Sequence, residues 1–476
     1  MKTRWLVSTA LIVFTATQGF AQFPEDALRF ATPGFGVGAR SLGMGNAYTG
    51  VASDFSALYW NPAGLAQLQH GEFSFGLSHL NFKDNSSFFG TSKSYTNNST
   101  NLNSLGLVFP VNVQRGSLVL ALGYTRNSNF ATGLSFNGFN PNSSIVQTYA
   151  QDGAPYPSDL SGNLAYQLFL ANIDSTTGRF DSPIRNSLTQ SGQVIESGGL
   201  NNWTGGAAID IARNLSVGLT LTYLSGTYKY DRTYSEKDTR GVYNSFPFDF
   251  DELVISDNVI SDLTGFNARL GMLYRVPDRF RFGINIKTPT MYNIKESFNT
   301  TARSYFDNGD VYPTSGPFET PSSNEYDVLT PWVFTVGGSF IIRDLVLSGD
   351  VEYTDWTQLE FDNANTDLIA LNKDIKQIFR PTVNLRAGAE YEIRDYGLRL
   401  RGGFIYNPSP YDGDPSEFDQ KYVTGGLGIL LGETTMLDLT YARGWWKTFR
   451  TNYNSTSRVG EDIRTNNLIM TFSYRF

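Results

Sequence analysis

The chain has 476 residues, of which 45 are acidic and 37 basic, giving a formal net charge of −8. This acidic balance excludes a nucleic-acid-binding function built on a basic surface, and the absence of cysteine excludes stabilisation by disulfides. The 46 glycines, 14% aromatic residues and modest 40% hydrophobic content are typical of pleated sheet with tight turns.

Residues 1–21 have the pattern of an export signal. Lys2 and Arg4 give a basic start, and a mostly apolar run follows from Leu6 to Phe14. This run is shorter than the roughly 20 residues that a helix needs to cross a bilayer, so we expect cleavage before Gln22 and no membrane anchor. The mature chain then has 35 basic and 45 acidic residues, a net charge of −10.

The next segment, 22–70, shows no regular alternation of apolar and polar residues. Six glycines between positions 34 and 50 interrupt it, and short helical pieces are expected at Phe55–Trp60 and after Pro62. Asn61 is a suitable helix cap because its side chain accepts from an unpaired N–H, while Pro62 has no N–H to leave unpaired. We expect this segment to fill the inside of a wide barrel as a hatch.

From residue 71 to 476 the sequence alternates between apolar and polar residues, as strands with two different faces do. The last strand, Leu468–Phe476, has Leu468, Met470 and Phe472 on one face and Thr471 and Ser473 on the other. No stretch approaches eighteen consecutive apolar residues, which excludes a helical membrane protein and leaves a membrane β-barrel open. Fourteen strand segments are expected, beginning near residues 71, 102, 118, 201, 215, 262, 279, 326, 344, 381, 397, 421, 434 and 464.

The links between these segments alternate between short turns and long polar loops, the longest at about 127–200. An even number of antiparallel strands with turns at one end and loops at the other predicts an all-β, 14-stranded transmembrane barrel. Because an unpaired N–H or C=O in hydrocarbon costs several kcal/mol, the last strand must pair with the first.

In such a barrel the apolar face contacts lipid and the polar face lines the lumen. Tryptophans near the strand ends are expected in the interfacial girdles, namely Trp332, Trp356, Trp445 and Trp446. Charged residues at the polar positions are expected to point inward and to pair across strands, namely Arg281, Lys287, Asp350, Glu352, Arg386, Glu390, Arg399 and Arg401.

The stretch GARSLGMGNAYTGVASDFSALYWNPAGLA resembles the N-terminal hatch of the FadL/OmpP/TodX family of outer-membrane transporters for long-chain fatty acids and aromatic hydrocarbons. Further similar stretches lie at 330–360, at 380–410 and in the terminal strand. The resemblance implies a fourteen-stranded barrel with a hatch, located in the outer membrane of Gram-negative bacteria. It also implies passive transport of hydrophobic small molecules, without a cofactor or a chemical step.

The resemblance further implies two functional features. The turn Asn61, Pro62, Ala63 and Gly64 corresponds to a hatch element that gates the lumen; the alternative is a capped turn that only shapes the hatch. A kink in the third strand, expected within 118–136, opens the wall sideways to lipid, with Gly123, Asn127 and Asn129 as candidates for the break. For Gly123 the alternative is a packing role beside the hatch.

Other functions stay open at this point. Type IX secretion uses related barrels with a similar glycine-rich start, and there the partner is a secreted protein. An enzyme is disfavoured because the neighbours Ser78 and His79 point to opposite faces of a strand. The two histidines are too few for a zinc site, and the acidic loop stretches match no complete calcium loop.

The expected partners are a hydrophobic ligand, outer-membrane lipid and lipopolysaccharide, and the barrel-assembly machinery. The protein is expected to be a monomer.

Overall fold

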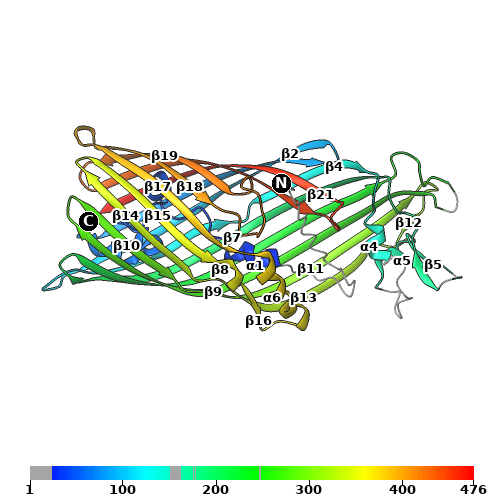
Figure 1. Cartoon of the computed structure of the whole chain (residues 1–476), viewed down its shortest axis with the longest axis horizontal. Coiled ribbons are helices and arrows are strands. Elements are labelled where there is room, and N and C mark those ends of the chain that lie inside the picture. Colours follow the sequence, from blue (N-terminus) through cyan, green and yellow to red (C-terminus); the bar gives the residue numbers. More distant parts are fainter. Residues whose placement is uncertain (1–23, 151–161, 175, 177, 246–247) are drawn as a thin grey trace, which may run out of the picture.

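The computed structural model describes residues 24–476 except 151–161, 175, 177 and 246–247, so the expected export signal lies outside the described residues. Fourteen wall strands form a closed antiparallel barrel (Figure 1). In order around the barrel they are β1 (Glu72–Phe88), β2 (Thr91–Val111), β3 (Leu118–Asn129) continued by β4 (Thr132–Asn140), β7 (Leu188–Ala212), β8 (Leu215–Lys237), β9 (Phe250–Val276), β10 (Phe280–Lys287) with β11 (Met291–Phe306), β14 (Val333–Ile342) with β13 (Phe318–Leu329), β15 (Leu345–Asp355), β17 (Pro381–Ile393), β18 (Leu398–Asn407), β19 (Gln420–Leu431), β20 (Thr435–Thr451) and β21 (Arg458–Arg475).

Short elements lie in the hatch and in the loops. They are α1 (Pro24–Ala31), α2 (Ala39–Gly43), α3 (Ala57–Trp60), η1 (Pro62–Gln67), α4 (Val146–Ala150), α5 (Leu164–Gln167), β5 (Asn172–Asp174), β6 (Arg179–Asp181), β12 (Val311–Tyr312), η2 (Trp356–Gln358), β16 (Glu360–Asp362), α6 (Thr366–Ile378) and η3 (Arg394–Tyr396). Of the helices in the described residues, none has the length and apolar character needed to span a bilayer.

The two ends of the sheet are joined as expected. Strand β21 pairs with β1 from Glu72 opposite Arg475 to Ser87 opposite Gly460. Phe476 continues the contact, because its N–H donates to the Gly71 carbonyl at 3.0 Å and its carbonyl accepts from the Gly71 N–H at 3.0 Å. The last residue is therefore part of the closure that leaves the sheet without an edge at this seam.

The strands extend further toward the long loops than the sequence predicts. Strand β9 has 27 residues and β8 has 23, and both β4 and the first part of β7 lie within the range 127–200 that was expected to be a loop. The reason is that the outward side chains become polar above the membrane while the backbone ladder continues. Alternation of apolar residues therefore marks only the part of each strand that lies in lipid.

The outward apolar residues form a continuous band around the wall. On β7 the band runs from Trp203, which is 56% exposed, to Ile211, which is 54% exposed. At about 3.3 Å per residue and a tilt of about 40°, this span is about 20 Å high, comparable to the apolar band of outer-membrane barrels. Leu385 on β17 and Leu400 on β18 have similar exposures of 46% and 43%. Such a band is suited to contact with acyl chains.

The prediction that four tryptophans lie in the interfacial girdles is correct for two of them. Trp332 and Trp445 lie on the outside, with 42% and 37% exposure. Trp356 is buried in the lumen, where its indole N–H donates to Thr382 Oγ1 at 2.9 Å, and Trp446 packs inside against Tyr422. For these two the prediction was wrong. Consecutive strand residues point to opposite faces, so Trp445 and Trp446 cannot both reach the interface.

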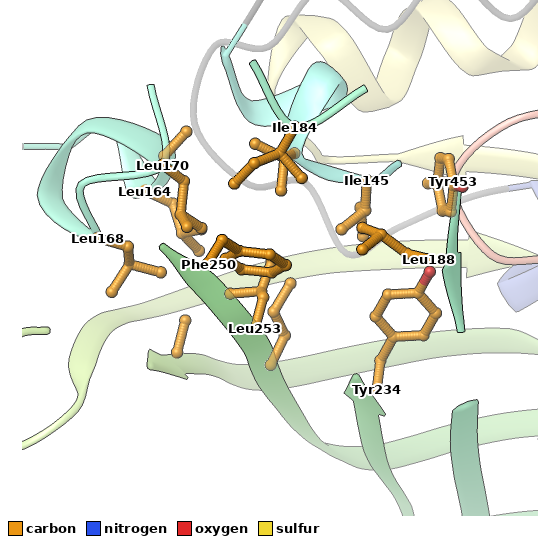
Figure 2. Close-up of a cluster of buried hydrophobic side chains, with 14 of the residues drawn as sticks. Ile145, Leu164, Leu168, Leu170, Ile184, Leu188, Tyr234, Phe250, Leu253 and Tyr453 are labelled. Carbon is orange, nitrogen blue, oxygen red and sulfur yellow. The ribbon is translucent and has the colours of Figure 1, made fainter. Parts of the chain in front are cut away.

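A packed apolar cap lies at the barrel end that carries the long loops. Figure 1 shows the C-terminus at one end of the barrel and α4, α5 and β5 at the other. Figure 2 shows the apolar side chains of this cap, contributed by the loop residues Ile145, Leu164 and Ile184 and by the wall residues Tyr234 and Phe250. These loops are therefore packed against the wall by a buried apolar cluster at this end of the barrel.

Candidate functional site: hatch, lumen cavity and third wall strand

Hydrogen bonds from the wall fix the hatch inside the lumen. Asp350 of β15 accepts from the backbone N–H groups of Tyr48 and Thr49, both at 2.9 Å. Glu72 of β1 accepts from the N–H of Phe55 at 2.8 Å. These N–H groups belong to turns and have no helical partner, so the wall carboxylates supply the acceptors that a buried backbone requires.

A buried ion-pair network joins the hatch to strands β17 and β18 of the wall. The carboxylate of Glu390 accepts from both Arg40 of the hatch, at 2.7 and 2.8 Å, and Arg401 of β18, at 2.7 Å. Arg401 also pairs with Asp438 at 2.6 Å. The expectation that the lumen charges point inward and pair across strands is confirmed for Glu390 and Arg401.

Asn61 caps the helical turn η1, as the sequence predicts. Its Oδ1 accepts from the Ala63 N–H at 3.2 Å, and Pro62 occupies the first helical position. The side-chain N–H₂ of the fully buried Asn61 donates to two carbonyls, that of Thr49 in the hatch at 2.8 Å and that of Met272 in β9 at 3.1 Å. One side chain therefore links two parts of the hatch to the wall. Ala63 and Gly64 are also buried, and a Cβ on Gly64 would lie 2.3 Å from the Ala52 carbonyl oxygen.

Gly123 does not lie at an interruption of the third wall strand. It sits in a continuous ladder, opposite Gly106 of β2 on one side and Thr204 of β7 on the other. A Cβ added to Gly123 would lie 2.5 Å from the Phe55 ring of the hatch, and one added to Gly106 would lie 1.9 Å from it. These contacts support the packing role beside the hatch, the alternative given for Gly123 above.

The interruption lies a few residues further along the strand. The ladder between β2 and β3 ends at Ser104 opposite Thr125, and the ladder between β3 and β7 shifts register between Thr125 and Ser128. Asn127 falls within this register shift. Asn129 is the last residue of β3, and its Oδ1 accepts from the Ala131 N–H at 3.1 Å across the gap to β4.

Beyond the interruption the chain passes to the inner side of the wall. Strand β4 pairs only with β7, from Thr132 opposite Glu196 onward, and forms no ladder with β2 in the described residues. The Asn97 side chain of β2 donates to the Thr132 carbonyl at 3.1 Å, and Ser86 of β1 donates to the Ser135 carbonyl at 2.5 Å. Because inward side chains of β1 and β2 bond to the β4 backbone, β4 lies across their inner face. Strand β2 thereby loses its wall neighbour above Ser104.

A cavity of about 170 Å³ lies between helix α1 and the rest of the hatch. Its apolar lining comes from both the hatch and the wall, including Phe30, Trp60, Leu200 and Leu224. The lining also includes Thr125 and Ser128, the two residues on either side of the register shift in β3. The cavity therefore borders the place where the wall loses its regular pairing.

Two cations face this cavity side by side. Arg269 of β9 and Lys287 of β10 are direct cross-strand partners, and both belong to the lining. Glu352, the only carboxylate in the described lining, is already paired with Arg386 at 2.7 Å and accepts from Asn384 at 3.0 Å. Neither Arg269 nor Lys287 forms an ion pair within the described ranges. The cavity therefore has two positive charges in excess.

Three aromatic rings connect the third strand to helix α1. Phe130, in the gap between β3 and β4, lies 6.1 Å from Phe30 of α1 and 5.4 Å from Tyr228 of β8, measured between ring centroids. Phe30 and Tyr228 are 5.8 Å apart. All three side chains are buried. Movement of α1 would therefore remove packing from the interrupted segment of the wall.

Some of these site residues could be predicted from the sequence and others could not. Lys287 was identified as an inward charge, whereas its partner Arg269 was missed. Arg269 was detectable, because it alternates with the apolar residues Ala268 and Leu270 of the same strand. Phe130 carried no comparable signal, since a single aromatic residue in a polar stretch does not indicate which element it packs against.

The fold is similar to solved outer-membrane transporters. The toluene transporter TodX of Pseudomonas putida superposes with a TM-score of 0.56 at 13% identity, over 93% of this chain and 99% of that one. A FadL homologue of Pseudomonas aeruginosa gives 0.57 at 14%, covering 92% and 98%. The toluene transporter TbuX of Ralstonia pickettii gives 0.53 at 15%, covering 93% and 98%. Identities this low establish a common fold only.

Sequence comparison identifies the family. Among curated proteins no sequence matches. The model of the outer membrane protein transport family (OMPP1/FadL/TodX) matches residues 199–476, which is more than half of the chain. This family consists of transporters and channels of the Gram-negative outer membrane. The chain therefore belongs to the OMPP1/FadL/TodX family of outer membrane transport proteins.

Proposed function

We propose that this protein carries hydrophobic small molecules with an anionic head group, such as long-chain fatty acids, across the outer membrane by passive diffusion. Family membership supports transport of hydrophobic compounds in general. The observation that carries the choice of substrate is the pair Arg269 and Lys287, two cations that face a cavity lined by both apolar and polar side chains. Alkanes and neutral aromatic hydrocarbons are the alternative substrates.

The charge argument favours an anion for a physical reason. Like charges directly opposite each other on neighbouring strands destabilise a sheet. A carboxylate between Arg269 and Lys287 removes this repulsion and forms charge-assisted hydrogen bonds with both. A neutral hydrocarbon supplies no counter-charge to either cation, and the guanidinium of Arg269 lies over the ring of Tyr59, 4.7 Å from its centroid.

The proposed route leads from the cavity sideways into the membrane. Transfer of an alkyl chain through water costs about 0.8 kcal/mol per methylene, so an apolar path that avoids the aqueous periplasm lowers the barrier. The end of the β2–β3 ladder at Ser104 and Thr125 supports an exit between these strands, because no backbone pairing joins them beyond this point in the described residues.

The hatch is proposed to control this route. In the described conformation Phe130 packs against Phe30 of α1, and β4 covers the inner face of β1 and β2. Displacement of α1 by a ligand releases Phe130 and allows the interrupted segment to move. The turn Asn61 to Gly64 holds the rest of the hatch against β9 during this change.

Uptake by whole cells tests the proposal. A strain lacking the gene is complemented with the wild type or with Arg269→Met/Lys287→Met, at equal surface expression. Radiolabelled palmitate, hexadecane and toluene are then supplied separately. Palmitate uptake should require the wild-type protein and fall in the double variant, with hexadecane and toluene unaffected by the substitutions. Equal palmitate uptake with and without the gene would contradict the proposal.

The secretion-shuttle alternative predicts a different phenotype, namely secreted proteins retained in the periplasm of the deletion strain. The family match does not favour it. The remaining expected partners, the barrel-assembly machinery and lipopolysaccharide, belong to this proposal as a consequence of the outer-membrane location.

A further inference from the structure

The outer wall carries a row of cations above the apolar band. Lys421 of β19 lies opposite Trp445 of β20, Trp445 lies opposite Arg464 of β21, and Arg464 lies opposite Lys83 of β1. These four residues face outward, because each is flanked along its strand by inward residues such as Tyr422, Ile463 and Phe82. The row thus crosses four adjacent strands, and Arg443 of β20 lies on the same face two residues below Trp445. Lys83, Lys421, Arg443 and Arg464 are called the basic patch below.

The height of the basic patch follows from the strand register. On β21 the outward residues toward the periplasmic turns are Leu468, Met470 and Phe472, which belong to the apolar band. Arg464 lies four residues beyond Leu468, about 10 Å further from the membrane centre at 3.3 Å per residue and a tilt of about 40°. This is the level of the lipid head groups at the cell-surface end.

The charges of the basic patch are poorly compensated within the protein. Lys83 and Arg464 are like charges directly opposite each other, an arrangement that destabilises a sheet unless an anion intervenes. Arg464 has one carboxylate neighbour, Asp462, at 3.4 Å, and Lys421 donates to the Ser416 carbonyl at 2.8 Å. Lys83 and Arg443 form no ion pair or side-chain hydrogen bond within the described residues. This patch is positive although the whole chain has a net charge of −8.

A different part of the rim shows what a compensated arrangement looks like. Lys295 of β11 also points outward, and it lies between two carboxylates, Asp262 of β9 and Glu325 of β13. Its Nζ is 3.6 Å from Glu325 Oε1. Lys295 therefore has its counter-charges in the protein, whereas the basic patch does not.

We propose that the basic patch binds the phosphate groups of an anionic glycolipid in the outer leaflet of the outer membrane. Lysine and arginine recognise phosphate by charge-assisted hydrogen bonds, and at a membrane surface each contributes to the attraction of anionic lipid. Trp445 in the middle of the row places an aromatic ring at the interface, where tryptophan is favoured. This inference depends on the outer-membrane location and is independent of the transported substrate.

The position of the patch gives the bound lipid a structural role. Strand β1 pairs with β2 in the wall. On its other side β2 is no longer paired with β3 above Ser104. Lys83 lies on β1 in the region where β1 and β2 continue as a hairpin above this level. A lipid held by Lys83 and Arg464 stabilises the seam between the first and last strands beside the interrupted part of the wall.

Native mass spectrometry of the full-length protein in detergent, titrated with diphosphoryl lipid A, tests this proposal. The variant Lys83→Gln/Arg443→Gln/Arg464→Gln should bind about 10- to 100-fold more weakly than the wild type. The matched control Lys229→Gln/Lys295→Gln, which removes outward lysines elsewhere on the rim, should bind as the wild type does. Resistance to unfolding by SDS at room temperature checks that the variants are folded.

A further arm identifies what is recognised. Lipid A stripped of its phosphates should bind the wild type about tenfold or more weakly than the diphosphoryl form, because the ion pairs are lost. Equal binding by the triple variant or equal binding of the dephosphorylated lipid would each overturn the proposal.

Discussion

Gly106 and Gly123 face each other across the ladder between β2 and β3, and together they leave the space that the Phe55 ring of the hatch occupies. The backbone of Phe55 is held at the same place, because its N–H donates to Glu72 of β1 at 2.8 Å. The space left by the two glycines and the hydrogen bond to the Glu72 carboxylate thus determine where this part of the hatch docks.

Gly123→Ala is expected to displace the hatch locally. The new Cβ lies 2.5 Å from the Phe55 ring and 2.4 Å from the Leu105 carbonyl, so the overpacking should cost about 1–3 kcal/mol of unfolding free energy in urea. In a Phe55→Ala background the contact with the ring is absent, and the same substitution should cost less. Equal costs in both backgrounds would show that Phe55 and Gly123 do not interact.

Asn61→Ala should loosen the hatch without unfolding the barrel. It removes hydrogen bonds to Thr49 and Met272 and the cap on Ala63, a loss of about 1–3 kcal/mol for buried polar groups left unpaired. Hydrogen exchange of amides 48–64 should accelerate, while exchange in β17 and β18 stays at the wild-type rate. If uptake of palmitate also remains unchanged at equal surface expression, the gating role proposed for residues 61–64 is wrong.

The pair Arg269 and Lys287 allows binding and stability to be separated. Arg269→Met/Lys287→Met should weaken palmitate binding about tenfold or more, since charge-assisted hydrogen bonds are lost, while binding of hexadecane stays unchanged. Without bound ligand, the double variant should be at least as stable as the wild type, because a like-charge pair is removed. A drop in thermal stability together with unchanged palmitate binding would indicate a purely structural role.

Phe130→Ala is expected to uncouple the third strand from helix α1. The side chain is buried between Phe30 and Tyr228, so its removal should cost about 3–5 kcal/mol if the site cannot collapse. A spin label at position 135 in β4 should become more mobile in this variant. Tyr124→Ala, which truncates an outward aromatic on the same strand, serves as the control and should leave β4 as ordered as in the wild type. Equal label mobility in all three proteins would contradict the proposed coupling.

The sequence predicted those features that depend on local chemistry. Closure of the last strand on the first follows from the cost of unpaired backbone groups, and the Asn61 cap follows from the side chain and the proline beside it. Features that depend on contacts between distant elements could not be predicted from the sequence. Gly123 was expected at a bend because glycine weakens strands, whereas its actual environment is set by Phe55, 68 positions earlier in the chain. The lengths of β8 and β9 were underestimated, because polar outward residues above the membrane carry no apolar alternation.

The most direct test of the account is to map where an anionic lipid binds in the purified protein. Hexadecanoate with a diazirine at the end of its chain is photolysed on the protein in detergent, and labelled peptides are identified by mass spectrometry. The account predicts labels on cavity residues such as Phe30, Leu224 and Tyr292, and their loss in Arg269→Met/Lys287→Met. Labels confined to outward residues such as Leu385 and Leu400, with none in the cavity, would contradict it.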